Sequence, residues 1–220
     1  MTDTIDVRNP RTGAIDYQIE VADDAVIEAA AAQLRAGQRE WLELGVTGRI
    51  EVLQRWKNEV IAHTTEIRDA VRADTGRRFV ADRETGALVG FIERWCAEAP
   101  ALFETQSNMS KTMPEVELRS LLDPYPLLGV ISPWNFPLLL SFIDAIPALL
   151  AGCAVMIKPS EVTPRFAKPV SDTIARVPEL ANVLQFVSGD GRAGAALIRH
   201  VDAIVFTGCL LYTSPSPRDA

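Results

Sequence analysis

The sequence predicts an α/β fold in which a helical N-terminal segment precedes a parallel sheet. After residue 126, short apolar runs without alternation are separated by helical segments, which is typical of a parallel sheet covered on both faces. Before residue 104, apolar residues recur mainly at helical spacing. The 220 residues are 48% hydrophobic and 23% charged, so the chain has the composition of a globular protein with a substantial core.

The N-terminal half is predicted to form a β-hairpin followed by four helices. Residues 5–20 are extended around a turn at 9–13 that contains proline and glycine. The first helix begins after Asp23 or Asp24 as N-cap, and the others cover residues 47–63, 64–75 and about 79–103. Gly76 is a natural C-cap, and residues 106–125 are expected to be extended. The predicted inward-facing residues of the first two helices are Val26, Ala29, Ala30, Leu34, Trp41, Ile50, Leu53, Trp56 and Val60.

The C-terminal half alternates strand and helix, as a Rossmann-like sheet does. The expected strands are residues 127–132, 154–158, 183–188 and 203–207. The expected helices are residues 138–150, 164–177 and 192–200, the second of them begun by Thr163 as N-cap and Pro164 at its first position.

Composition and charge exclude several classes of function. The net charge of −7, without a basic cluster, argues against nucleic acid as a partner. The three cysteines have neither disulfide nor metal-ligand spacing, so no metal is expected and a reduced, cytoplasmic protein is predicted. No signal peptide is evident. Residues 136–157 are long and apolar enough for a membrane span, but a buried helix, a turn and a buried strand explain them without placing Asp144 in lipid.

Two polar groups are expected at neighbouring strand tips, where open α/β sheets bind ligands. Asn135 stands between Pro133 and Pro137, where its amide could stabilise an oxyanion or could simply satisfy turn backbone groups. Lys158 and Glu161 could bind the hydroxyls of a ribose, or could form a solvated ion pair at a helix entrance. Together, the two tips favour a ligand site.

Other motifs carry weaker signals. Gly189, Gly191 and Gly194 have the G-x-G-x-x-G spacing, which by itself is a weak nucleotide-binding signature. His63 and His200 are solitary and are expected to be structural. Cys153, at the edge opposite the predicted site, is expected to be a buried structural thiol, and Trp41, Trp56 and Trp95 are expected in the core.

The motifs P-W-N-F-P at 133–137 and K-P-S-E at 158–161 closely resemble those of the aldehyde dehydrogenase superfamily. The resemblance extends over residues 5–208, including N-P-x-T-G at 9–13 and V-F-T-G at 205–208. It implies that Asn135 helps to form the oxyanion hole for the thiohemiacetal. It also implies a site for NAD, with NADP as an open alternative, because a carboxylate at position 161 would repel a 2′-phosphate. The cofactor-binding residues it implies are Ile131, Ser132, Trp134, Asn135, Lys158, Ser160, Glu161, Gly191 and Gly208.

The resemblance further implies that a parent enzyme oxidises an aldehyde to a carboxylic acid. Family members supply a cysteine nucleophile and a glutamate base downstream of the F-T-G element, and this chain contains no G-Q-x-C motif. Residues 1–208 are therefore expected to be an inactive N-terminal fragment with most of a cofactor domain, in which about 106–125 belong to the strands of a homodimer or homotetramer. Two alternatives are a non-catalytic nucleotide-binding module and a CoA-acylating aldehyde dehydrogenase. Residues 209–220 resemble a translated sequencing adapter, so this tail is expected to be artefactual.

Overall fold

A four-stranded parallel sheet lies at the centre of the structure, a computed structural model that describes residues 3–208. Its strands are β5 (Leu127–Ile131), β6 (Ala154–Lys158), β7 (Leu184–Phe186) and β8 (Ala203–Phe206), in the order β7-β6-β5-β8. All three strand pairs are parallel, which confirms the predicted α/β class. The predicted tail at 209–220 lies outside the described residues.

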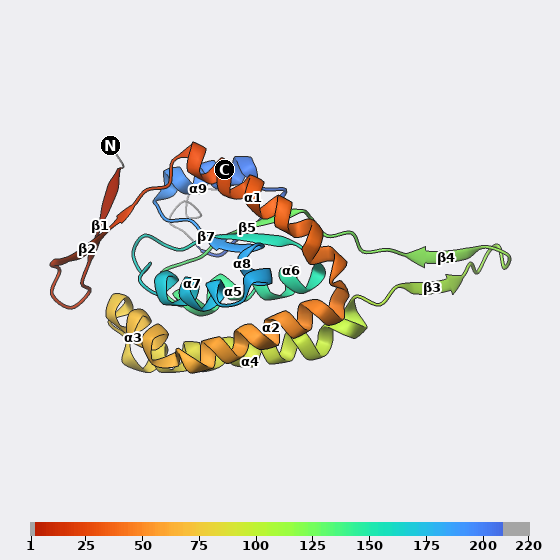
Figure 1. Cartoon of the computed structure of the whole chain (residues 1–220), viewed down its shortest axis with the longest axis horizontal. Coiled ribbons are helices and arrows are strands. Elements are labelled where there is room, and N and C mark those ends of the chain that lie inside the picture. The colour runs from red at the N-terminus through yellow and green to blue at the C-terminus, as the bar shows by residue number, and fades with distance from the viewer. Residues whose placement is uncertain (1–2, 209–220) are drawn as a thin grey trace, which may run out of the picture.

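Helices cover both faces of this sheet in layers (Figure 1). The helices α1 (Asp24–Glu43) and α9 (Gly191–His200) lie on one face. On the other face lie α5 (Pro137–Phe142), α6 (Ala145–Ala151), α7 (Ala167–Ala175) and α8 (Pro178–Ala181). A third helical layer, α2 (Gly45–Ala62), α3 (Thr64–Thr75) and α4 (Arg78–Leu102), packs on the outside of these shorter helices. The central strands are therefore buried on both sides.

Tight packing of α9 on the sheet explains one glycine. A Cβ at Gly129, in the middle of β5, would lie 2.5 Å from Leu197 Cδ2 and 3.1 Å from Val201 Cγ2. Such a contact would force the helix away from the strand, because core atoms are already close-packed. Gly129 thus permits the close approach of helix and sheet.

Two antiparallel hairpins extend from this body. The strands β1 (Thr4–Arg8) and β2 (Ile15–Glu20) pair around the predicted turn, and β3 (Gln106–Met109) pairs with β4 (Glu117–Ser120). The β3–β4 hairpin projects far from the rest of the chain (Figure 1), and every residue of β4 is exposed. Extended chain is confirmed in these two segments, while the part of residues 106–125 in an oligomer stays a prediction.

The first four helices agree closely with the prediction, but the buried face of α1 does not. Asp23 caps α1 through a bond from the Val26 N–H (2.9 Å), and Gly76 ends α3 with φ of +66°. The buried stripe of α1 is Ile27, Ala31, Leu34, Gln38 and Trp41, whereas Val26 is 54% exposed and Ala29 is also exposed. The predicted face was one residue out of register at its N-terminal end, because the alanine-rich run offers apolar residues on several faces.

The predicted helix at 138–150 is two helices, α5 and α6, separated at Ile143 and Asp144. Pro147 explains the break, since a proline ring clashes with the carbonyl four residues earlier and that carbonyl belongs to Ile143. Both helices are short and contribute buried side chains to the core, as the reading of residues 136–157 without a membrane span predicted. Within residues 3–208, no helix combines the length and apolar character that crossing a bilayer requires.

The helix predicted at 164–177 begins later, at Ala167, and ends at Ala175. Tertiary contacts take the groups that were expected to start it. The Thr163 hydroxyl donates to the Trp134 carbonyl (3.2 Å) instead of capping the helix. Buried Asp74 of α3 accepts from the Arg165 N–H and from Arg165 Nε, each at 2.8 Å. Residues before 167 therefore remain a turn against neighbouring elements.

Candidate functional site

Three strand tips meet at the carboxyl edge of the sheet. Ile131 of β5 is in register with Lys158 of β6 and with Phe206 of β8. The Ser132 N–H donates to the Lys158 carbonyl (3.1 Å), and the Thr207 N–H donates to the Ile131 carbonyl (3.1 Å). These bonds continue the ladder just past the strands, so the loops that follow begin at the same level.

A cavity of about 370 Å³ opens above these tips. This volume is within the usual range of small-molecule sites. Its lining includes eight of the nine residues predicted to bind the cofactor, together with Pro133 and Val162; the eight are Ile131, Ser132, Trp134, Asn135, Lys158, Ser160, Glu161 and Gly208. Gly191 is not among the lining residues. It is the first residue of α9, where a Cβ would meet nothing within 4 Å.

Lys158 is a buried cation whose partners face this cavity. The residue is 3% exposed, and its Nζ donates to the Pro159 carbonyl (3.0 Å) and to Glu161 Oε2 (3.2 Å). The Glu161 side chain is about two-fifths exposed. An ammonium with three donors and a carboxylate with free acceptor sites therefore stand together at the rim, which is the donor set that a diol such as ribose requires.

The loop that carries Asn135 is held through its backbone. Arg77 Nη2 donates to the Asn135 carbonyl (3.0 Å), and Thr163 holds the preceding carbonyl. Among residues 3–208, none bonds the side-chain amide of Asn135, which is half-buried and lines the cavity. Turn backbone groups in this part of the chain thus do not use the amide, and it can donate to a ligand.

Ser132 is held from the helix that follows the loop. The Ser141 hydroxyl oxygen lies 2.6 Å from the Pro137 carbonyl and 2.7 Å from the Ser132 hydroxyl. Ser141 has one hydroxyl hydrogen, so donation to the carbonyl leaves it accepting from Ser132. All three groups are buried, and this fixes the start of the loop.

No sequence pattern pointed to two residues at the start of α4 that contact this loop, its N-cap Arg77 and Glu84. The guanidinium of Arg77 lies over the rings of Trp134 and Phe136, and the buried carboxylate of Glu84 accepts from the N–H groups of Leu138 and Leu139. Both are more than 50 residues away along the chain, so local pattern could not connect them to the loop.

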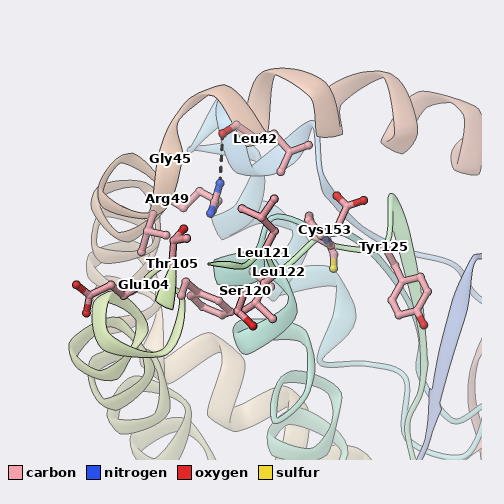
Figure 2. Close-up of a pocket in the computed structure, with 15 residues that line it drawn as sticks. Leu42, Gly45, Arg49, Glu104, Thr105, Ser120, Leu121, Leu122, Tyr125 and Cys153 are labelled. Atoms are coloured by element: carbon pink, nitrogen blue, oxygen red, sulfur yellow. Dashed lines mark hydrogen bonds between the residues drawn. The ribbon is translucent and has the colours of Figure 1, made fainter. Parts of the chain in front are cut away.

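At the opposite, amino edge of the sheet, a second cavity is lined by side chains with structural roles (Figure 2). A cavity of about 490 Å³ there is lined by residues that include Arg49, Leu121, Leu122 and Cys153. Arg49 is buried, and its donors bond to the carbonyls of Leu150 (3.0 Å), Leu42 (3.3 Å) and Trp41 (3.4 Å). Burial raises the pKa of the Cys153 thiol, which disfavours the reactive thiolate and agrees with the predicted structural role.

The remaining motifs have structural partners. Asp190 caps α9 by accepting from the Arg192 N–H (2.9 Å), so a side chain occupies the helix start after the predicted glycine-rich turn. His200 Nε2 lies 3.0 Å from Asp24, and His63 lies 3.8 Å from Glu59. Trp41 and Trp56 are fully buried, as predicted, whereas Trp95 is partly buried against the core. Residues 3–208 contain no group of three side chains placed to hold a metal ion.

Fold and site together define an α/β protein with a small-molecule cavity at the carboxyl edge of a parallel sheet. The family model "Aldehyde dehydrogenase family" matches residues 1–210. The chain therefore belongs to the aldehyde dehydrogenase family.

Similar proteins agree with this assignment. The structure of a protein described as an aldehyde dehydrogenase, PutA from Anabaena variabilis, is 47% identical, with a TM-score of 0.92 over 95% of this chain and 44% of that one. An NAD-dependent benzaldehyde dehydrogenase from Corynebacterium glutamicum is 26% identical, with a TM-score of 0.84 over 96% of this chain and 46% of that one. A Mycobacterium ulcerans protein named as a succinate-semialdehyde dehydrogenase for NADP(+) is 31% identical over 90% of this chain. The chain spans 38% of that relative's length.

Proposed function

We propose that the chain supplies the cofactor floor and the oxyanion donor of an enzyme that oxidises an aldehyde to a carboxylic acid with NAD. The observation that supports this most is the meeting of Asn135 with the Lys158–Glu161 pair in one cavity. A ligand held by the pair would thus lie beside an amide that can stabilise negative charge on a carbonyl oxygen. Since the relatives are much longer, this activity is a proposal about the whole protein.

The side chains around the cavity fit a dinucleotide. Lys158 and Glu161 would hold the adenosine ribose, Lys158 as donor and Glu161 as acceptor, and the exposed face of Trp134 would cover part of the ligand. Ser160 and Gly208 complete the rim. Gly191 does not line this cavity, so it would contact only a part of the cofactor that extends beyond it. When bound, the nicotinamide would accept the hydride that the aldehyde carbon loses on oxidation. Similar proteins include one named for NAD and one named for NADP(+), and the carboxylate at 161 favours NAD.

The oxidation needs a donor for the carbonyl oxygen while a nucleophile attacks the carbon. Asn135 would supply that donor from a loop whose backbone is fixed, which keeps the reorganisation cost of charge development low. The nucleophile would have to come from outside residues 3–208, because burial raises the pKa of both described thiols, Cys96 and Cys153. The full sequence also contains no G-Q-x-C motif, so we propose that the 220-residue chain binds cofactor and does not turn over.

A second cavity supports an approach for the aldehyde from the other side of this loop. It has a volume of about 670 Å³ and is lined largely by apolar side chains, including Phe79, Phe136 and Leu139. Since Phe136, which lines this cavity, directly follows Asn135, an aldehyde bound here would lie next to the loop that carries the proposed oxyanion donor. Residues 1–208 would then form most of a cofactor domain, with the β3–β4 hairpin as an assembly element of a dimer or tetramer.

Calorimetric titration of the purified chain with NAD+ and NADP+ tests the proposal. We expect NAD+ to bind more tightly, and Asn135→Ala to leave that affinity within about threefold because its proposed role is toward the aldehyde oxygen. Absorbance at the NADH band, recorded with aldehyde present, should not rise. Aldehyde-dependent NADH formation would contradict the proposed inactivity, and no binding of either nucleotide would contradict the cofactor site.

A further inference from the structure

A buried carboxylate binds the first turn of the helix that follows the Asn135 loop. Glu84 of α4 is 1% exposed, and its Oε2 accepts from the N–H groups of Leu138 and Leu139, both at 3.0 Å. These N–H groups belong to the first turn of α5, whose N-cap residue Phe136 has no side-chain oxygen to accept them. A helix distant in sequence thus supplies the cap that the loop itself lacks.

A second side chain from the start of α4 holds the other end of the same segment. Arg77, the N-cap residue of α4, donates to the Asn135 carbonyl at 3.0 Å. Its guanidinium carbon lies 5.8 Å from the ring centroid of Trp134 and 5.4 Å from that of Phe136, which is cation–π distance. Arg77 and Glu84 are seven residues apart, about two helical turns. Two rigidly spaced groups therefore hold the backbone at Asn135 itself and again at Leu138 and Leu139.

Capping alone does not explain why a glutamate occupies this buried position. Its second oxygen, Oε1, is buried without a hydrogen-bond partner among the described residues, which is costly for a carboxylate. Burial raises the pKa of Glu84 to about 7, despite the two N–H donors and the charge of Arg77. A serine or aspartate in the loop could cap α5 at lower cost. What the long side chain adds is a direct tie between the loop and the helical layer.

The charged groups near this tie are few. The helices α5 and α6, which pack on α4, carry no ionisable side chain. From α3, Arg68 lies 3.7 Å from Asp82, and from α2, Lys57 lies 3.0 Å from Glu93. Asp82 and Arg83 line the neighbouring apolar cavity with Glu84. Arg77 is thus the one cation of these that acts on Glu84 itself.

We propose that Glu84 and Arg77 are positioning residues for Asn135. Together they fix the backbone from Trp134 to Leu139, so that the Asn135 amide is held toward the cavity before any ligand arrives. The functional meaning rests on the proposed role of Asn135 as oxyanion donor. The positioning itself is a property of the chain and can be measured without catalysis.

Two-dimensional NMR of the ¹⁵N-labelled 220-residue chain tests this proposal through the side-chain amide of Asn135. In Glu84→Leu, we expect its two proton signals to shift, and the Leu138 and Leu139 amides to exchange with solvent about tenfold faster or more, because each loses its acceptor. Glu84→Gln should largely restore both, since a carboxamide oxygen still accepts two N–H bonds. Arg77→Met should shift the Asn135 signals without exposing Leu138 and Leu139. Glu93→Gln, on the exposed side of the same helix, is the matched control and should change none of them.

A pH series adds a readout that a purely structural cap would not move. Between about pH 5.5 and 8.5, the Asn135 side-chain signals should titrate in the unmodified chain and stay constant in Glu84→Gln. The comparison shows that the titration comes from Glu84 and not from one of the two histidines, which both chains retain. Unchanged Asn135 signals in a folded Glu84→Leu chain would overturn the proposal and leave Glu84 as a cap alone. If Glu84→Leu does not fold, Asn135 signals that fail to titrate in the unmodified chain would overturn it. Addition of NAD+ to the same samples tests the cofactor site separately, through the amides of Ser132 and Lys158.

Discussion

The two edges of the parallel sheet each bury a cation, and they use it in different ways. At the amino edge, the Arg49 donors are directed to backbone carbonyls of α1 and α6, which a helix leaves unpaired at its C-terminal end. At the carboxyl edge, Lys158 has one backbone partner and one carboxylate, and that carboxylate reaches into a cavity. A buried charge whose partners are all backbone stabilises the fold. A buried charge paired with a half-exposed carboxylate remains available to a ligand.

The largest expected effect is the loss of the structural cation. Arg49→Met should lower the free energy of unfolding by about 3 kcal/mol, because three carbonyls, two of them in buried hydrogen bonds, lose the guanidinium at once. Urea denaturation followed by circular dichroism measures this. Arg49→Lys should recover part of the loss, and NAD+ affinity of the folded chain should stay the same. A loss below about 1 kcal/mol would show that water replaces the guanidinium, and that the two edges differ less than the contacts indicate.

The next effect concerns the buried carboxylate beneath the site. Glu84 has a pKa of about 7 in the folded chain against 4.5 for an ordinary glutamate, so the folded state binds the proton more tightly. Stability from this group is therefore full below about pH 4.5, falls as the pH rises through the folded pKa of about 7, and becomes constant about one pH unit above that. The total fall should be about 3 kcal/mol.

The measurement is the difference in unfolding free energy between the unmodified chain and Glu84→Gln across that range. Taking the difference removes the contribution of Asp144, whose pKa burial also raises. A flat difference would mean that the buried oxygen is solvated, and would weaken the contrast between the two sides of the sheet.

A smaller effect is expected when the ligand-facing cation is removed. Lys158→Met should weaken NAD+ binding about tenfold, since the ribose loses a charged donor, with a stability change of about 1 kcal/mol. Lys168→Met is the control, because Lys168 is an exposed lysine paired with Asp172. Titration calorimetry compares the two variants. Equal affinities would show that the cavity does not use its buried ammonium.

The smallest effect should be a change in cofactor preference. Glu161→Gln removes the negative charge that would repel a 2′-phosphate, so the ratio of NAD+ to NADP+ affinity should fall by about threefold to tenfold. Glu179→Gln, a surface carboxylate paired with Arg55, should leave the ratio unchanged. A ratio that rises in Glu161→Gln would mean that Glu161 does not lie at the ribose.

Local sequence patterns were enough to predict the α/β class and most of the element boundaries, and they pointed to one loop as a candidate site. The apolar runs of β5 and β6 and the prolines around Asn135 are local features, and local spacing is enough to read them. The same holds for the helix ends at Asp23 and Gly76, where one residue decides the geometry. Where several faces were equally apolar, as in α1, the sequence did not specify which one is buried.

Packing between elements determined which distant groups contact one another. It joined Asn135 to Arg77, and α5 to Glu84, across more than 50 residues. The helix α7 also begins later than predicted, because the Thr163 hydroxyl and the Arg165 N–H bond to Trp134 and Asp74 instead. Such contacts arise from packing between elements, and a hydrogen bond between distant residues leaves no periodicity in the chain. The motif therefore predicted where a candidate site would lie, and the fold decided how firmly the loop at that place is held.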